Sequence, residues 1–89
     1  MKAVVTVVGK DTIGIFAKVS TYLAGCGANI IGVSQTILDD MFVMIMSLDV
    51  DRLTLPFGEF ADGIRAYGEE NALVIHAMHE DIFHSMHRI

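Results

Sequence analysis

The chain has 89 residues, of which 53% are hydrophobic, and its formal net charge is -5. A chain of this size suits one domain with a single core, and so large a hydrophobic share predicts that a partner subunit covers part of its surface. The six basic residues are scattered along the chain. A nucleic-acid partner is therefore not expected, because such binding draws on clustered lysine and arginine.

No membrane or secretion segment is evident in the sequence. The longest apolar run, Met41–Leu48, is far shorter than the roughly 20 residues that a bilayer span needs. Lys2 leads directly into a strand-like run instead of a signal-peptide pattern. The single cysteine, Cys26, cannot form an internal disulfide and is predicted to be buried and inert. These features predict a cytoplasmic protein.

The first third of the chain predicts a strand followed by a helix. The valine-rich residues Lys2–Val8 are typical of a strand that is covered on both faces, near the middle of a sheet. Apolar residues then recur at helical spacing, which predicts one buried stripe formed by Ile15, Phe16, Val19, Leu23 and Cys26. Gly25 and Gly27 end this helix, and Gly27 is well placed for a left-handed C-terminal cap.

Two further strands follow. Residues Asn29–Ile37 and Met41–Val50 each have a strand pattern, and Leu38–Asp40 predicts a tight hairpin between them. In the second of these strands, one face carries Phe42, Met44, Met46 and Leu48 and the other carries Val43 and Ile45. Both faces of this strand are therefore expected to need cover.

The last third predicts a helix, a strand and a tail helix. Pro56 suits the first position of a helix whose buried stripe is Phe57, Phe60, Ala61, Ile64 and Tyr67. Three glycines within this helix are expected to weaken it, each by up to about 1 kcal/mol relative to alanine; they are Gly58, Gly63 and Gly68. Residues Ala72–Met78 then predict a strand, and Glu80–Ile89 a short amphipathic helix that needs a surface to dock on.

This order of elements predicts an α+β fold. With right-handed crossovers it gives a ferredoxin-like βαββαβ sandwich, in which a four-stranded antiparallel sheet carries two helices on one face. We expect one domain over residues 1–89, with its core in 1–78 and a helical tail in 80–89. The second face of the sheet is then bare, so self-association, the tail helix or both are predicted to bury it.

The turn after the first strand discriminates among proteins of this fold. It lacks the C-x-x-C of a heavy-metal transport domain and the arginine of an acylphosphatase-like enzyme, and the strands lack the aromatics of an RNA-recognition domain. The pattern G-x-D-x-x-G-I, then A-x-V-S-x-x-L-A, then G-A-N-I resembles the ACT domain, a small regulatory module that binds amino acids beside or inside metabolic enzymes. With the ending D-I-F-H-S-M-H-R-I, the whole chain looks like the stand-alone, single-ACT-domain bacterial and archaeal proteins grouped as an uncharacterised family.

The resemblance implies a regulatory homodimer, or a higher homo-oligomer, with an amino acid at the subunit interface, and it allows for a regulated protein partner. The ligand-binding positions that it carries over are Asp11, Ile13, Gly14, Ile15, Asn29 and Ile30. Asp11 could accept a hydrogen bond from an ammonium group, the helix N-terminus could receive a carboxylate, and Asn29 could do either. Ile13 stands where the family often has proline.

The residues alone leave other roles open. Asp11 could cap the first helix and Asn29 could tie down its loop, in a ligand-free module that docks on a partner through its sheet face and tail helix. His84 and His87, three apart on the tail helix, form a weaker metal candidate that would take a third ligand from Glu80 or His79. No catalytic constellation is evident, so neither an enzyme nor a cofactor is expected.

Overall fold

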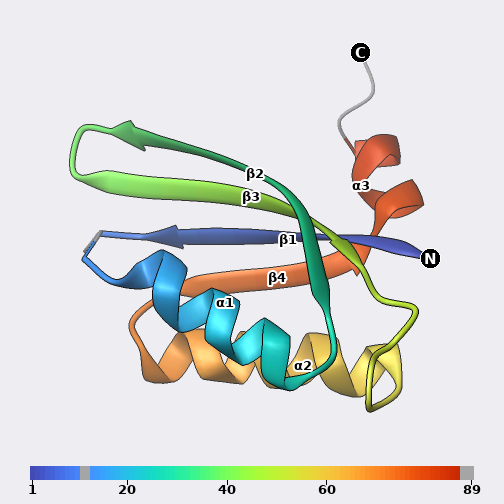
Figure 1. Cartoon of the computed structure of the whole chain (residues 1–89). Coiled ribbons are helices and arrows are strands. Elements are labelled where there is room, and N and C mark those ends of the chain that lie inside the picture. Colours follow the sequence, from blue (N-terminus) through green and yellow to red (C-terminus); the bar gives the residue numbers. More distant parts are fainter. Residues whose placement is uncertain (11–12, 87–89) are drawn as a thin grey trace.

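The sheet and two of the helices form two layers, seen in the computed structural model, which describes residues 1–10 and 13–86 (Figure 1). The elements are β1 (Lys2–Gly9), α1 (Ile15–Gly25), β2 (Asn29–Leu38), β3 (Met41–Asp49), α2 (Phe57–Glu70), β4 (Val74–His79) and α3 (Glu80–Met86). The strands form one antiparallel sheet in the order β2-β3-β1-β4, and α1 and α2 lie on one face of it. The predicted ferredoxin-like βαββαβ fold is therefore confirmed.

The core lies between the sheet and the two helices. Alternate residues of β1 and β3 point toward the helices and are fully buried, because successive side chains of a strand point to opposite faces. The largest fully buried side chains include Val5, Val7, Met44, Met46, Leu48, Leu23, Phe60 and Ile64. The strand and helix periods of the sequence thus place the same set of residues in one core.

The C-terminus of α1 is a Schellman motif around Gly27, as the sequence predicted. Gly27 has a φ of 83°, the Ala28 N–H donates to the Leu23 carbonyl at 3.0 Å, and the Gly27 N–H donates to the Ala24 carbonyl at 3.1 Å. A Cβ atom on Gly27 would also collide with the carbonyl oxygen of Arg52 in the loop after β3. Gly27 is therefore required by its backbone conformation and by a close backbone approach.

Two residues of the predicted α1 stripe are less buried than predicted. Ile15, Val19 and Leu23 are spaced four apart and face the core, whereas Phe16 is one position further round the helix and is 44% exposed. Cys26 is half-buried instead of buried, because the helix ends at Gly25 and Cys26 is its C-cap residue. The prediction that Phe16 belongs to the buried stripe is therefore wrong, whereas Cys26 packs against the core but is only partly buried.

Two of the glycines in α2 permit close packing. A Cβ atom on Gly63 would lie 2.7 Å from the hydroxyl oxygen of Tyr22, and one on Gly68 would lie 2.7 Å from Cγ1 of Ile75. Nothing lies within 4 Å of the corresponding position at Gly58. Pro56 also differs from the prediction, because it is the N-cap residue of α2 and Phe57 is the first helical residue.

We expect Gly58→Ala to raise the free energy of unfolding by about 0.5 kcal/mol, because alanine costs less backbone entropy in a helix and meets no neighbour here. Gly63→Ala and Gly68→Ala should lower it, because their methyl groups displace Tyr22 and Ile75. Urea denaturation of the three variants tests this. If all three variants are more stable than the wild type, these glycines only lower the helix propensity of α2 and are not needed for close packing.

The second face of the sheet is covered only near α3. Val4 is buried, but Val8 and Ile45, which share this face, are half-buried, so complete cover on both faces is not observed. Phe83 of α3 is half-buried and lines a small hollow with Val4 and Ile45, so α3 lies over this part of the sheet. Within the described part of the chain, no helix is both long enough and apolar enough to cross a bilayer.

Candidate functional site

The turn after β1 combines a buried strand end with an exposed helix start. Gly9 is buried, and a Cβ atom there would collide with the side chain of Leu73, so this glycine lets the two segments approach. Gly14 has a φ of 75° and is the N-cap residue of α1, so no side chain at the N-cap position accepts a hydrogen bond from the helix. Asp11 is therefore not the N-cap residue, and its own position lies outside the described residues.

The two isoleucines that flank Gly14 differ in their surroundings. Ile15, the first residue of α1, is 4% exposed and belongs to the core, whereas Ile13 is 84% exposed. The first turn of α1 holds no acidic side chain. An anionic group that approaches this helix start would therefore meet no fixed negative charge within the described first turn.

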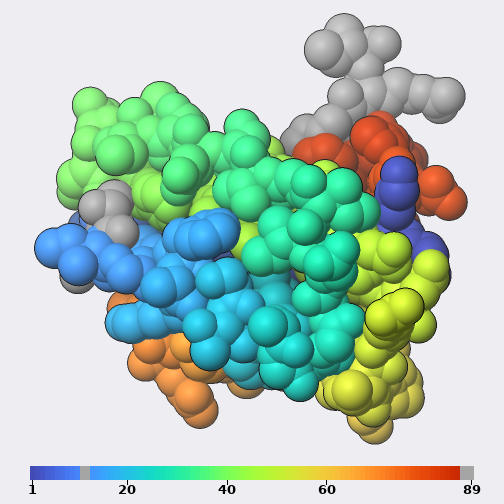
Figure 2. Space-filling view, viewed as in Figure 1, coloured from blue at the N-terminus to red at the C-terminus, as the bar shows by residue number. Residues whose placement is uncertain are grey.

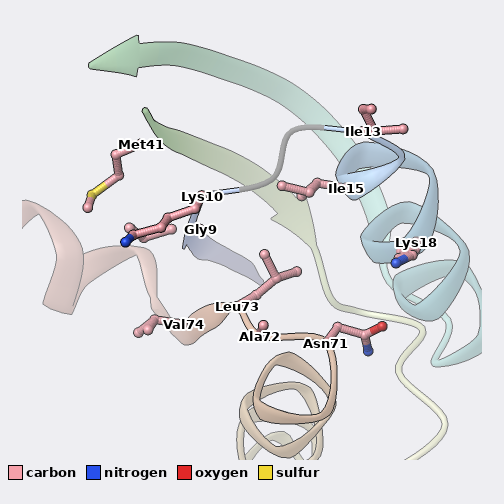
Figure 3. Close-up of a pocket in the computed structure, with 11 residues that line it drawn as sticks. Gly9, Lys10, Ile13, Ile15, Lys18, Met41, Asn71, Ala72, Leu73 and Val74 are labelled. Atoms are coloured by element: carbon pink, nitrogen blue, oxygen red, sulfur yellow. The ribbon is translucent and has the colours of Figure 1, made fainter. Parts of the chain in front are cut away.

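A groove lies beside this turn, between it and the loop that joins α2 to β4 (Figure 3). We call it the turn groove; its volume is about 470 Å³, and the residues that line it include Lys10, Ile15, Lys18, Met41, Leu73 and Val74. The α2–β4 loop is held firmly, because the Leu73 N–H donates to the Gly68 carbonyl at 2.8 Å and Nδ2 of Asn71 donates to the Tyr67 carbonyl at 2.8 Å. This wall of the groove is thus preformed.

Asn29 and Ile30 lie at the opposite end of the sheet from this turn. Asn29 is paired with Asp49, which is paired in turn with Lys2 at the start of β1. Since the turn follows the end of β1, the two parts are about 20 Å apart at the usual strand rise of about 3.3 Å per residue. Asn29 is exposed, and Ile30 packs against the core opposite Leu48. One chain therefore does not bring the predicted site residues together.

Asn29, the first residue of β2, borders a polar hollow that is also lined by Gly27, the end of β3 and the loop after β3. Asp51 lies in it, forms an ion pair with the amine of Met1, and donates its own N–H to Oδ1 of Asp49 at 2.9 Å. The hydrogen bond to Asp51 raises the pKa of the Met1 amine above its usual 8.0. The same bond lowers the pKa of the Asp51 carboxyl below its usual 3.8.

These opposite shifts predict how stability depends on pH. The amine with a raised pKa stabilises the fold fully below pH 8.0, and this contribution is lost as the pH rises through the raised value. The carboxyl with a lowered pKa stabilises the fold above pH 3.8, and its contribution is lost as the pH falls. We expect the Asp51→Asn variant to lose the decrease in thermal unfolding midpoint that this ion pair causes as the pH rises above 8.0. The control variant Asp40→Asn, in the β2–β3 turn, should still show that decrease.

The histidines do not assemble a metal site within the described chain. Nε2 of His84 lies 3.3 Å from Oε1 of Glu80, one helical turn before it, and the ring of His79 stacks on Phe57 with centroids 4.1 Å apart. Among the described residues no group of three or more histidine, cysteine, aspartate or glutamate side chains could hold a metal ion. His87, the other candidate ligand, lies outside those residues.

The sequence did not predict most of the turn groove. Met41 belongs to one segment far from Lys10 in sequence, and Leu73 and Val74 belong to another. They meet Lys10 because the antiparallel order puts the end of β1 beside the starts of β3 and β4. That topology was itself predicted. The groove could have been located from this topology, by asking which strand ends it places side by side.

Comparison with known proteins assigns the family and the fold. A family model of the ACT domain matches residues 2–76, which include the turn after β1 and Asn29. The chain therefore belongs to the ACT-domain family. Within it, a UPF0237 protein of Listeria innocua is 45% identical over 89 residues, covering 100% of both chains, so the chain also belongs to the UPF0237 group. The resemblance noted in the sequence is confirmed.

Solved structures agree with this assignment. An ACT domain protein from Streptococcus pneumoniae superimposes with a TM-score of 0.83 and 38% identity, covering 93% of both chains. A formyltetrahydrofolate deformylase from Pseudomonas syringae has a TM-score of 0.76 over 88% of this chain and 27% of its own, with 23% identity. At that identity the second likeness concerns the fold alone. The ACT fold thus also occurs as one part of a larger enzyme.

Proposed function

We propose that this chain is a cytoplasmic regulatory homodimer that binds a small amino-acid-like ligand between its subunits. One subunit would contribute the turn residues Asp11, Ile13, Gly14 and Ile15, and the partner subunit would contribute Asn29 and Ile30. The observation that best supports this is the separation of the two sets at opposite ends of the sheet in one chain. ACT-domain proteins of this small type are typically regulatory, so the proposal includes no catalytic step.

The edge strand β2 offers a surface for the second subunit. It is ten residues long, it is hydrogen-bonded to β3 on one side only, and the hairpin that it forms with β3 stands at the surface (Figure 2). Its exposed large apolar side chains are Ile31, Val33, Ile37 and Leu38. A long apolar edge strand is a template for pairing with another strand, which supports dimerisation here.

A two-fold axis beside β2 would complete the site. Two copies of β2 that pair antiparallel run in opposite directions, so the partner subunit's Asn29 would lie near Leu38, at the end of the sheet that carries the turn after β1. A ligand between the turn and Asn29 of the partner subunit would then touch both chains. Its binding would favour the dimer, and regulation of a further protein would follow from that population shift.

A lysine on the edge strand tests the dimer. We expect Val33→Lys to weaken self-association at least about tenfold, because a two-fold interface brings the two like charges close together. Sedimentation at several concentrations measures this, and the matched control is Val74→Lys on β4, the opposite edge of the sheet. If only the control weakens the dimer, β4 and not β2 is the interface.

A thermal-shift screen against the amino acids, followed by calorimetry, tests the ligand. A ligand at 100 times its Kd should stabilise the folded state by about 2.7 kcal/mol. Asp11→Ala and Asn29→Ala should each abolish the shift, whereas Asp62→Ala, at an exposed position on α2 away from the proposed interface, should not. If no amino acid raises the midpoint while both variants only destabilise the protein, the ligand-binding proposal is wrong.

The exposed part of α3 supports a second candidate, a ligand-free module that docks on a partner protein. Ile82 and Met86 are large, apolar and exposed on α3, although Phe83 is half-buried against the sheet. Removal of residues 80–89 tests this candidate. Loss of self-association in the shortened chain would favour it, whereas an unchanged dimer that still responds to amino acids would leave the first proposal standing.

A further inference from the structure

The turn groove has the size and shape of a small-molecule site. Its volume of about 470 Å³ falls within the range of about 300–1,000 Å³ that is usual for such sites. It includes Ile13 and Ile15 of the proposed ligand-binding turn, so a ligand held at the turn would extend into it. The groove therefore bears on which ligand the turn selects.

The walls of the groove are mainly aliphatic. Ile15 and Leu73, which lie near its centre in Figure 3, are nearly buried and fixed by the core. Val74 and Met41 border the groove and are exposed, at 57% and 40%. A polar ligand side chain would gain nothing from these walls, whereas an aliphatic one would cover apolar surface that now faces solvent.

Two lysines supply positive charge at the groove. Lys10 lies on the side of Met41 and Lys18 on the side of Asn71, with Ile15 and Leu73 between them (Figure 3). Neither lysine forms an ion pair with another described residue, and none of the described residues that line the groove is acidic. Aliphatic walls with two cations at the sides are complementary to a carboxylate that carries an apolar chain.

We infer that the ligand of this protein is an amino acid with an aliphatic side chain, such as leucine, isoleucine or valine. The side chain would lie between Ile15 and Val74, and the carboxylate would be held by Lys10 or Lys18. This inference rests on the proposed function, because it names the class of ligand that the same turn binds. It adds a groove within one chain to the site that was proposed between two chains.

Calorimetry with a graded set of compounds tests the inference. We expect L-leucine to bind at least about tenfold more tightly than L-alanine, since each methylene in an apolar pocket contributes strongly to discrimination. L-Serine and 3-methylbutylamine, which lack the aliphatic chain and the carboxylate respectively, should bind more weakly than leucine. A preference for serine over leucine would overturn the inference.

Matched variants assign the binding to the groove. Lys10→Met and Lys18→Met should together weaken leucine binding at least about tenfold, as expected for lost charge-assisted hydrogen bonds. Lys2→Met, which removes the same charge away from the groove, should not. Val74→Ala should likewise weaken leucine binding, whereas Ile82→Ala on α3 should leave it unchanged. These positions are exposed, so each variant is expected to fold.

The outcomes separate this inference from the proposed function. If a polar amino acid binds and Asn29→Ala abolishes its binding, the intersubunit site stands and the aliphatic ligand class is wrong. If leucine binds and responds to the groove variants but not to Asn29→Ala, the ligand class stands and the intersubunit site is wrong. If none of the amino acids binds, both are overturned.

Discussion

Phe60→Ala is expected to lower the free energy of unfolding by about 4 kcal/mol, the usual cost of truncating a buried phenylalanine. Phe60 is fully buried on α2 and packs beside Phe57, with ring centroids 5.7 Å apart. Removing its ring would open a cavity between α2 and the sheet. Because total stability of a domain this size is only about 5–10 kcal/mol, the variant should be close to unfolding at 37 °C.

Phe16→Ala is the matched control for this variant. The chemical change is the same, but Phe16 is 44% exposed on α1 and lies outside the core. We expect its effect on the free energy of unfolding to stay within about 0.5 kcal/mol, as for most surface substitutions. Urea denaturation of both variants decides the point. Equal losses at the two positions would mean that Phe16 is buried in the protein as it exists in solution.

Gly27→Ala is expected to cost about 3 kcal/mol, close to the upper end of the usual range for single substitutions. The left-handed conformation of Gly27 disfavours any side chain, and its Cβ atom would collide with the Arg52 carbonyl oxygen. The loop after β3 is attached at this point, because the Thr54 N–H donates to the Cys26 carbonyl at 3.0 Å. The collision would therefore push that loop away from the end of α1.

Substitutions at two other glycines separate the cost of the left-handed backbone conformation from the cost of the collision with Arg52. Gly14 has a φ of 75°, and no described residue lies within 4 Å of its Cβ position, so Gly14→Ala should show the conformational cost without a collision, about 1 kcal/mol. Gly25 has open space and lies in the helix, so Gly25→Ala should be neutral or slightly stabilising. Unfolding midpoints in urea give the comparison. If Gly27→Ala costs no more than Gly14→Ala, the contact with Arg52 adds nothing.

The fold was predictable because its determinants are local and mutually consistent. The strand period of Met41–Asp49, the helical spacing of Ile15, Val19 and Leu23, and the glycine stop at Gly27 each pointed to one element, and the order of elements allowed few topologies. The errors arose where a pattern extended too far. Phe16 was one apolar residue beyond the true stripe, and helix propensity alone could not show that Gly63 and Gly68 make room for Tyr22 and Ile75.

The candidate site was predictable only in part. The turn around Gly14 was recognisable because its pattern G-x-D-x-x-G-I, between a strand and a helix, resembles that of the ACT domain. Leu73, Val74 and Met41 could not be assigned to the same place, because they meet the turn through sheet pairing and their own neighbours in sequence carry no sign of it. The distance between Asn29 and the turn likewise follows from strand direction, and it supports the expectation, already implied by the resemblance, that two chains share the site.

Mixing two defective variants tests the intersubunit site most directly. Asp11→Ala and Asn29→Ala homodimers are each expected to bind no ligand in calorimetry with the amino acid that gives the largest thermal shift. After the two variants are mixed and allowed to exchange subunits, each mixed dimer holds one site with both residues intact, so binding should return at one of its two sites. Binding that stays absent after exchange, although the mixed dimer is folded, would contradict a site shared between subunits.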